Sequence, residues 1–131
     1  MAEKEILKEL LVDKQAMLRE AVAKAKDLIG IDEHSGDVVF KISLATLSVQ
    51  QKIELYLIAR YFAKGLKLIK SDKTSIDELS KNLGIEKKNV GWRSSEMEDD
   101  GIIHSAGRSK YVISPVKVSD ILDDIRKKLG I

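Results

Sequence analysis

The most informative stretch of the chain lies in its C-terminal half: Ser75-Ile76-Asp77-Glu78-Leu79-Ser80-Lys81-Asn82-Leu83-Gly84-Ile85. Ser75, followed three residues later by Glu78, predicts a capping box, in which two side chains satisfy free backbone amides at the start of a helix. Gly84 is expected to end this helix, because glycine readily takes the left-handed conformation that stops one. The stretch therefore predicts a short helix and a tight turn.

A second helix is expected directly after the turn, over residues 86–100, with Gly101 closing it. Residues 102–104 and 111–113 are short segments rich in β-branched or aromatic side chains, so they predict two strands. The polar residues 105–110 between them are typical of a hairpin tip. The resulting order is helix, turn, helix and β-hairpin.

This order resembles the winged helix-turn-helix superfamily of archaeal and bacterial transcription regulators, over about residues 38–115. The resemblance is carried by the stretch 75–85, Val90, Met97, Gly101-Ile102-Ile103, Gly107-Arg108 and Tyr111-Val112-Ile113. It implies a positioning helix, a recognition helix that enters the major groove of double-stranded DNA, and a basic wing. The expected fold class is mostly α with a small β-hairpin, a winged helix-turn-helix with a long N-terminal helix and a short C-terminal helix. Winged helices also serve as protein-interaction modules, so the fold does not by itself decide the partner.

The candidate DNA-binding residues begin at the start of the expected recognition helix, which is the part that enters a groove. Asn89 and Arg93 are the expected base-reading residues, because an amide can pair with adenine and a guanidinium with guanine. Lys87 and Lys88 are expected to hold phosphates, and Ser94 is expected to reach one. The alternative is that these cations merely solvate a surface helix.

Further candidates lie around that helix. Arg108 and Lys110 at the hairpin tip are suited to contacts with the DNA backbone or minor groove. Ser75 lies at a helix N-terminus that favours a phosphate, although capping alone would explain it. Trp92 can stack on DNA, anchor a protein partner or fold back into the core. Four acids within residues 96–100 oppose the helix dipole, so this end is expected to point away from phosphates.

The N-terminal segment, residues 3–29, contains no glycine or proline and predicts one helix of about 27 residues, roughly 40 Å long. Its apolar stripe has spacings of three and four and is interrupted by Lys14. The stripe consists of Leu7, Leu11, Leu18, Val22, Ala25 and Ile29. A helix this long exceeds what a small domain can cover, which favours self-association into a homodimer. The alternative is that the stripe lies across the core of its own domain.

A polar run with two glycines, residues 30–37, is expected to be a loop and marks a boundary. The chain then divides into an N-terminal helix and linker at 1–36, a winged-helix domain at 37–116 and a C-terminal helix at 117–131. Charge shifts at the same place. Residues 1–36 carry six basic and eight acidic residues, whereas residues 37–131 carry 17 and 13.

Three more elements are expected around the motif. Residues 38–42 predict a strand, and Ser48 with Gln51 predicts a second capping box that opens a helix ending at Gly65. Apolar side chains occur on most sides of that helix, so it is expected to be buried on two faces. The C-terminal helix is expected to be capped by Ser119, and its apolar face either packs on its own core or forms a dimer interface. That face consists of Ile121, Leu122, Ile125 and Leu129.

Composition narrows the function further. The 131 residues include no cysteine, which excludes disulfides and thiolate metal sites. His34 and His104 have no second ligand at metal spacing and no phosphate-binding glycine loop is present, so no enzyme, metal or cofactor is expected. The sequence shows no signal peptide or membrane span, which predicts a cytoplasmic protein with no membrane partner and no small-molecule substrate.

The expected function is sequence-directed binding of duplex DNA by a homodimeric transcriptional regulator. The alternative is a non-enzymatic module that scaffolds a protein complex. Phosphate contacts weaken steeply with salt and a hydrophobic protein interface does not, so salt dependence separates the two.

Overall fold

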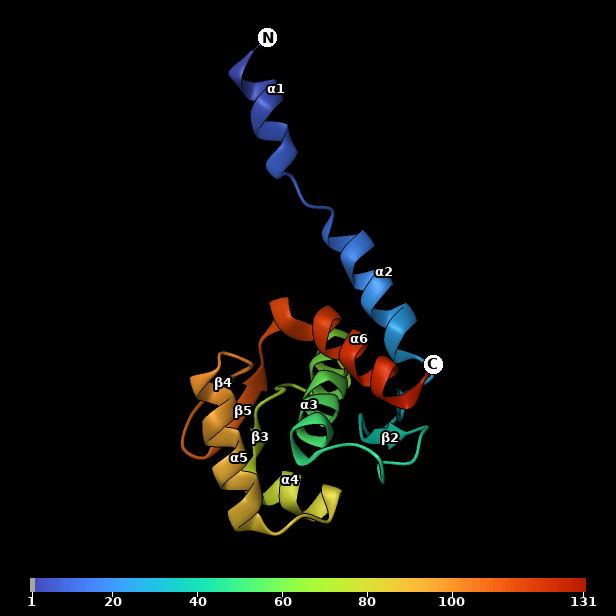
Figure 1. Ribbon diagram of the computed structural model, residues 1–131, viewed down its shortest axis with the longest axis vertical. Coiled ribbons are helices and arrows are strands. Elements are labelled where there is room, and N and C mark those ends of the chain that lie inside the picture. The colour runs from blue at the N-terminus through green and yellow to red at the C-terminus, as the bar shows by residue number, and fades with distance from the viewer. Residues whose placement is uncertain (1) are drawn as a thin grey trace.

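The computed structural model describes residues 2–131. Figure 1 shows a helical body with small antiparallel sheets and an N-terminal arm that projects from it. The fold is mixed α/β: the expected predominance of helix is confirmed, and a second small sheet accompanies the expected hairpin. In chain order the elements are α1 (Glu3–Leu7), the 3-10 helix η1 (Lys8–Leu10), α2 (Lys14–Ala25), β1 (Ile29–Ile31), β2 (Val38–Phe40), α3 (Val49–Gly65), β3 (Thr74–Ser75), α4 (Ile76–Leu83), α5 (Lys87–Asp99), β4 (Ile103–Ser105), β5 (Lys110–Ile113), the 3-10 helix η2 (Pro115–Lys117) and α6 (Val118–Leu129).

Helix α3 is the centre of the core. Its start is confirmed as a capping box: the Ser48 hydroxyl accepts a bond from the Gln51 amide at 3.1 Å, and the Gln51 side chain accepts one from the Ser48 amide at 3.1 Å. Every residue from 53 to 59 is buried, so the helix is covered on more than one face as expected. Its neighbours are α4, α5, α6 and the strands β1, β2 and β5.

The second half of the chain forms α4, α5 and a three-stranded sheet in the order β3-β5-β4. The expected hairpin is present, with Ile103 opposite Ile113 across β4 and β5. The two-residue strand β3 was not anticipated; it pairs Thr74 with Tyr111 and ties the start of α4 to the hairpin. Gly84 ends α4 with φ of 65°, the left-handed conformation expected there.

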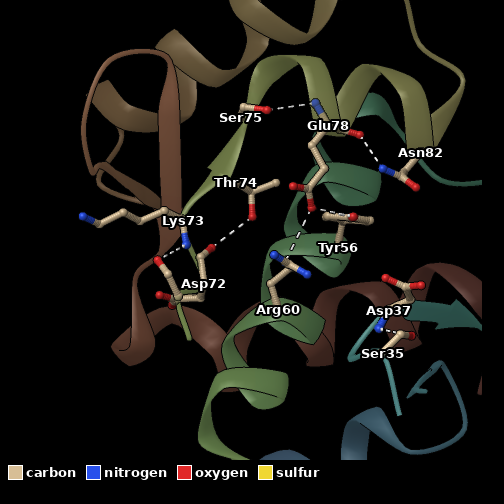
Figure 2. Close-up of polar contacts among 11 residues, drawn as sticks. Ser35, Asp37, Tyr56, Arg60, Asp72, Lys73, Thr74, Ser75, Glu78 and Asn82 are labelled. Atoms are coloured by element: carbon tan, nitrogen blue, oxygen red, sulfur yellow. Dashed lines mark hydrogen bonds and ion pairs between the residues drawn. The ribbon is translucent and has the colours of Figure 1, made fainter. Parts of the chain in front are cut away.

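Only half of the capping box expected at α4 forms. The Ser75 hydroxyl accepts a bond from the Glu78 amide at 3.0 Å, but Glu78 does not return one. Its carboxylate instead accepts the Tyr56 hydroxyl at 2.8 Å and lies 3.5 Å from Arg60, as Figure 2 shows. Tertiary contacts to α3 have therefore drawn this side chain away from the helix start.

The prediction of one continuous helix over residues 3–29 is wrong. The chain leaves helical geometry at Leu11 and resumes it at Lys14, where Asp13 caps α2 by accepting bonds from the amides of Gln15 and Ala16 at 3.0 and 3.1 Å. Asp favours such a cap over a helix interior, and residues 2–20 are all exposed, so no packing favours the longer helix. The helix also stops at Ala25 rather than Ile29.

The loop expected over residues 30–37 is shorter than predicted. Gly30 and Ile31 belong to β1, which pairs with β2 so that Ile29 lies opposite Phe40. The turn between the strands is held by Asp32, whose carboxylate accepts bonds from two backbone amides at 2.8 and 2.9 Å. Because this hairpin packs against α3, residues 29–40 form part of the folded body rather than a free linker.

Helix α6 packs its apolar face into the chain's own core. Ile121, Leu122 and Ile125 are buried, as is Val118 at its first turn. The helix begins at Val118, so Ser119 is not its cap; the Ser119 hydroxyl lies 2.7 Å from the Lys24 ammonium of α2. This contact helps to hold the C-terminal half of α2 against the body.

Candidate nucleic-acid interface

Helix α5 divides into an inner and an outer face. Val90, Ser94 and Met97 are fully buried and turn toward α3. On the outer side, Lys87, Lys88 and Asn89 are exposed at the helix N-terminus. Lys88 and Asn89 make no side-chain hydrogen bond or ion pair within residues 2–131, so both remain available to a ligand.

Ser94 does not belong to the exposed set, and the prediction that it reaches a phosphate is wrong. It lies four residues after Val90 and therefore shares the buried face of the helix. Its hydroxyl is enclosed, without a hydrogen-bond partner in the part of the chain that the structure describes. The position of Ser94 in the helical repeat, rather than the polarity of its side chain, places it on the buried face of α5.

Arg93, an expected base-reading residue, is only half-exposed, unlike the exposed Lys87 and Lys88. Its guanidinium lies 3.6 Å from the Glu96 carboxylate and 5.3 Å from the centre of the Trp92 ring. It is thus oriented by its own helix, by one ion pair and one cation–π contact. Reading a base would require this side chain to leave both partners.

Trp92 is exposed, with 64% of its surface accessible, so the alternative that it folds into the core is excluded. Trp92 lies one helical turn after Lys88, so the two side chains project from the same exposed side of α5. A large aromatic ring held in water at this position is suited to contact with another molecule.

An open cleft of about 580 Å³ lies where the starts of α4 and α5 meet the hairpin. The cleft is lined by Ser75 of β3, Ile76 and Asp77 of α4, Glu86 just before α5, Lys87 and Lys88 of α5, and Ser109 of the hairpin tip. The structure thus brings three of the sequence-predicted residues to one place. Lys87 forms an ion pair with Asp77 across the cleft, which lowers the free positive charge there.

Ser75 has a structural role that accounts for its position. It is half-buried, and its hydroxyl accepts the Glu78 amide at 3.0 Å. The next amide, that of Ile76, donates to the Ser109 carbonyl at 3.1 Å and joins the helix start to the hairpin tip. Ser75 was expected either to bind a phosphate or to cap the helix, and the observed contacts are those of a helix cap.

The hairpin tip turns tightly through residues with positive φ. Gly107 has φ of 116° and Ser109 has φ of 55°, so this turn needs conformations that L-residues rarely adopt. Arg108 and Lys110 are exposed on either side of Ser109. Neither side chain forms a hydrogen bond or ion pair with residues 2–131, so both cations face solvent.

Charge is polarised along α5. The cations lie in its first two turns, whereas Glu98 and Asp99 are exposed in its last turn with Asp100 just beyond. Burial, followed by the nearby Glu98 charge, raises the pKa of the Tyr111 phenol behind this end of the helix. A polyanion would be attracted to one end of α5 and repelled by the other.

A polar network missed by sequence reasoning fixes α4 on α3. Glu78 accepts the Tyr56 hydroxyl and pairs with Arg60 (Figure 2). Burial, with added contributions from Glu78, raises the pKa of Tyr56 well above its usual value, which keeps the phenol protonated as a donor. The distance of 22 residues between Tyr56 and Glu78 left no local signal of this pairing.

No three His, Cys, Asp or Glu side chains of residues 2–131 gather as metal ligands. No helix in this part of the chain combines the length and apolar character that crossing a bilayer requires. Comparison with known proteins found no matching family model, no similar curated protein and no similar solved structure.

Proposed function

We propose that the chain binds duplex DNA as a winged helix-turn-helix protein, with α5 as the recognition helix and the β4–β5 hairpin as the wing. The order α3, β3, α4, α5, β4, β5 supports this fold, because a third strand joins the hairpin and the left-handed Gly84 makes the turn between α4 and α5. Regulation of transcription is the use we propose.

The observation that carries the proposal is the grouping of unpaired cations from separate elements. Lys88 at the start of α5 lines the cleft that Ser109 of the hairpin also lines, and Arg108 and Lys110 flank that serine. Of these three cations only Lys88 lines the cleft. Cations that come from two elements meeting at one cleft are suited to two successive phosphates or to a phosphate and a groove.

Asn89, Lys88, Arg108, Trp92 and Arg93 have different roles in this arrangement. Asn89 is the base-reading residue, because its amide is free in the described chain and can pair with adenine in the major groove. Lys88 and Arg108 hold phosphates. Trp92 packs against the sugar or the thymine methyl, and Arg93 contacts DNA only after leaving Glu96.

Salt-dependent binding tests the proposal. Anisotropy of a labelled duplex, measured over a series of salt concentrations, should give a linear fall of log K with log salt. Replacing Lys88→Ala or Arg108→Ala should reduce the steepness of that fall by about 0.9 for each lost phosphate contact. Lys128→Ala is the matched control, because this exposed lysine lies on α6, which packs on α2 and α3.

The outcomes are distinct. Binding whose salt dependence is the same in the Lys88 and Arg108 variants as in the control would exclude this face. Asn89→Ala should leave the salt dependence unchanged and relax discrimination between A·T and other base pairs.

The exposure of Trp92 also favours a second function, a protein-interaction module that scaffolds a complex. Tryptophan is enriched among residues that dominate protein interfaces. In that case the native chain would bind a protein partner even at high salt and would not bind the duplex. Trp92→Ala would abolish binding of the protein partner.

A further inference from the structure

The N-terminal arm, residues 2–13, is an apolar segment with nothing packed on it. Every one of these residues is exposed, including Leu10 at 75% and Leu11 at 77%. Helix α1 has only five residues, too few to be stable in water without a partner surface. Figure 1 shows the arm extending away from the body, in line with α2. The arm therefore needs a surface that its own body does not supply in this conformation.

The body has an apolar cleft of about 660 Å³ at the other end of α2. It lies between α2, β1 and the C-terminal end of α3, and its apolar lining includes Leu18, Val22, Tyr61, Phe62 and Leu66. Leu66 on its rim is 63% exposed. One chain thus carries both an uncovered apolar arm and an uncovered apolar cleft.

The charges of the two surfaces are opposite. The arm has four acids, Glu3, Glu5, Glu9 and Asp13, against two lysines. The cleft is lined by three lysines and one acid: Lys26, Lys41, Lys64 and Asp72. Although Lys64 lies 3.5 Å from Asp72, the balance of the cleft stays positive. An acidic apolar segment is therefore its complementary occupant.

The residue pattern also suits antiparallel pairing of the arm with a second α2. If Leu10 of one chain lies opposite Leu18 of another, counting in opposite directions places Ile6 opposite Val22. The same register places Glu9 opposite Arg19 and Lys8 opposite Glu20. Apolar side chains meet apolar ones, and Glu9 and Lys8 each meet an opposite charge. The same register places Lys4 opposite Lys24 and the two Lys14 side chains opposite each other, so these like charges oppose the pairing.

We infer that two copies of this chain form a dimer by exchanging arms, so that the arm of each lies in the cleft between α2 and α3 of the other. Such an interface is the same on both copies and closes on itself, as a two-fold dimer requires. The interface uses neither α5 nor the β4–β5 hairpin, so it is independent of DNA binding and would present two copies of α5.

The mass of the full chain, without DNA, tests the inference by sedimentation equilibrium or light scattering. The native chain should have twice the monomer mass. Leu10→Asp on the arm and Leu66→Asp in the cleft should each lower the dimer fraction at least tenfold, and both positions are exposed, so neither change should unfold the monomer. Val116→Asp on η2 is the control, an exposed valine outside both surfaces, and should leave the mass doubled.

Charge reversal gives a second readout. Glu9→Arg and Arg19→Glu should each weaken the dimer, and the two together should restore it. A native chain that is monomeric at all concentrations would overturn the inference, as would a dimer that Leu10→Asp and Leu66→Asp leave intact. A monomer whose arm is protected from hydrogen exchange would overturn it too, because the arm would then fold back on its own α2.

Discussion

Glu54 is a buried carboxyl group in the middle of α3, and its ionisation should control how stability depends on pH. Its side chain is only 6% exposed. Gln50, one turn earlier, donates a hydrogen bond to it at 3.3 Å, and Asp124 of α6 is the nearby charge. Burial raises the pKa of Glu54 from 4.5 to about 7, and the Asp124 charge adds to the increase, whereas the Gln50 bond opposes it.

The sign and size of the effect follow from this pKa. Between pH 4.5 and about 7 the folded protein holds the Glu54 proton while the unfolded chain has lost it, so the free energy of unfolding falls as pH rises through this window. At about 1.36 kcal/mol for each pH unit, the loss amounts to about 3 kcal/mol above pH 7. Glu54→Gln cannot ionise and keeps the shape of the side chain. It should therefore be more stable than the native protein by up to about 3 kcal/mol at pH 8 and equal to it below pH 4.5.

Urea unfolding of the native protein and of Glu54→Gln, at a series of pH values between 4 and 8.5, would measure this difference. Both proteins contain the same other titratable groups, so the contributions of those groups cancel in the difference between the two free energies of unfolding. Glu33→Gln, an exposed glutamate in the β1–β2 turn, is the control and should track the native protein throughout. A difference in unfolding free energy between Glu54→Gln and the native protein that stays constant with pH would show that Glu54 does not have a raised pKa in the folded protein.

Two further predictions concern stability alone. Tyr56→Phe removes the hydroxyl that donates a hydrogen bond to Glu78 at 2.8 Å. In urea unfolding it should lower the free energy of unfolding by about 1–2 kcal/mol. Tyr61→Phe is the control, because the Tyr61 hydroxyl makes no hydrogen bond within residues 2–131, and it should change this free energy little. Gly84→Ala should destabilise by about 1 kcal/mol because φ is 65° there. Gly65→Ala, at a helical position with open space around it, should instead raise the melting temperature slightly, and a loss of similar size at both glycines would contradict this account.

Features that depend on residues close together in the chain were predicted correctly from the sequence. The Ser48–Gln51 capping box, the left-handed Gly84 and the β4–β5 hairpin each depend on interactions within a few residues. The exposed cations of α5 follow in the same way, because Val90 and Met97 define the inner face of the helix and the lysines lie outside it. Ser94 was misplaced although the same periodicity assigns it to the inner face.

Features that depend on distant partners could not be read in this way. The strand β1 exists because β2 is there to pair with it, and Glu78 leaves the start of α4 because Tyr56 and Arg60 reach it from α3. The apolar stripe of residues 3–29 implied one long helix, yet without a packed surface the chain breaks where Asp13 caps α2. Local patterning specified where helices and turns form, since capping and backbone freedom act over a turn or two. Which residues are buried depends on how distant segments pack against α3. That packing also determines which polar side chains form hydrogen bonds or ion pairs and which remain exposed to solvent.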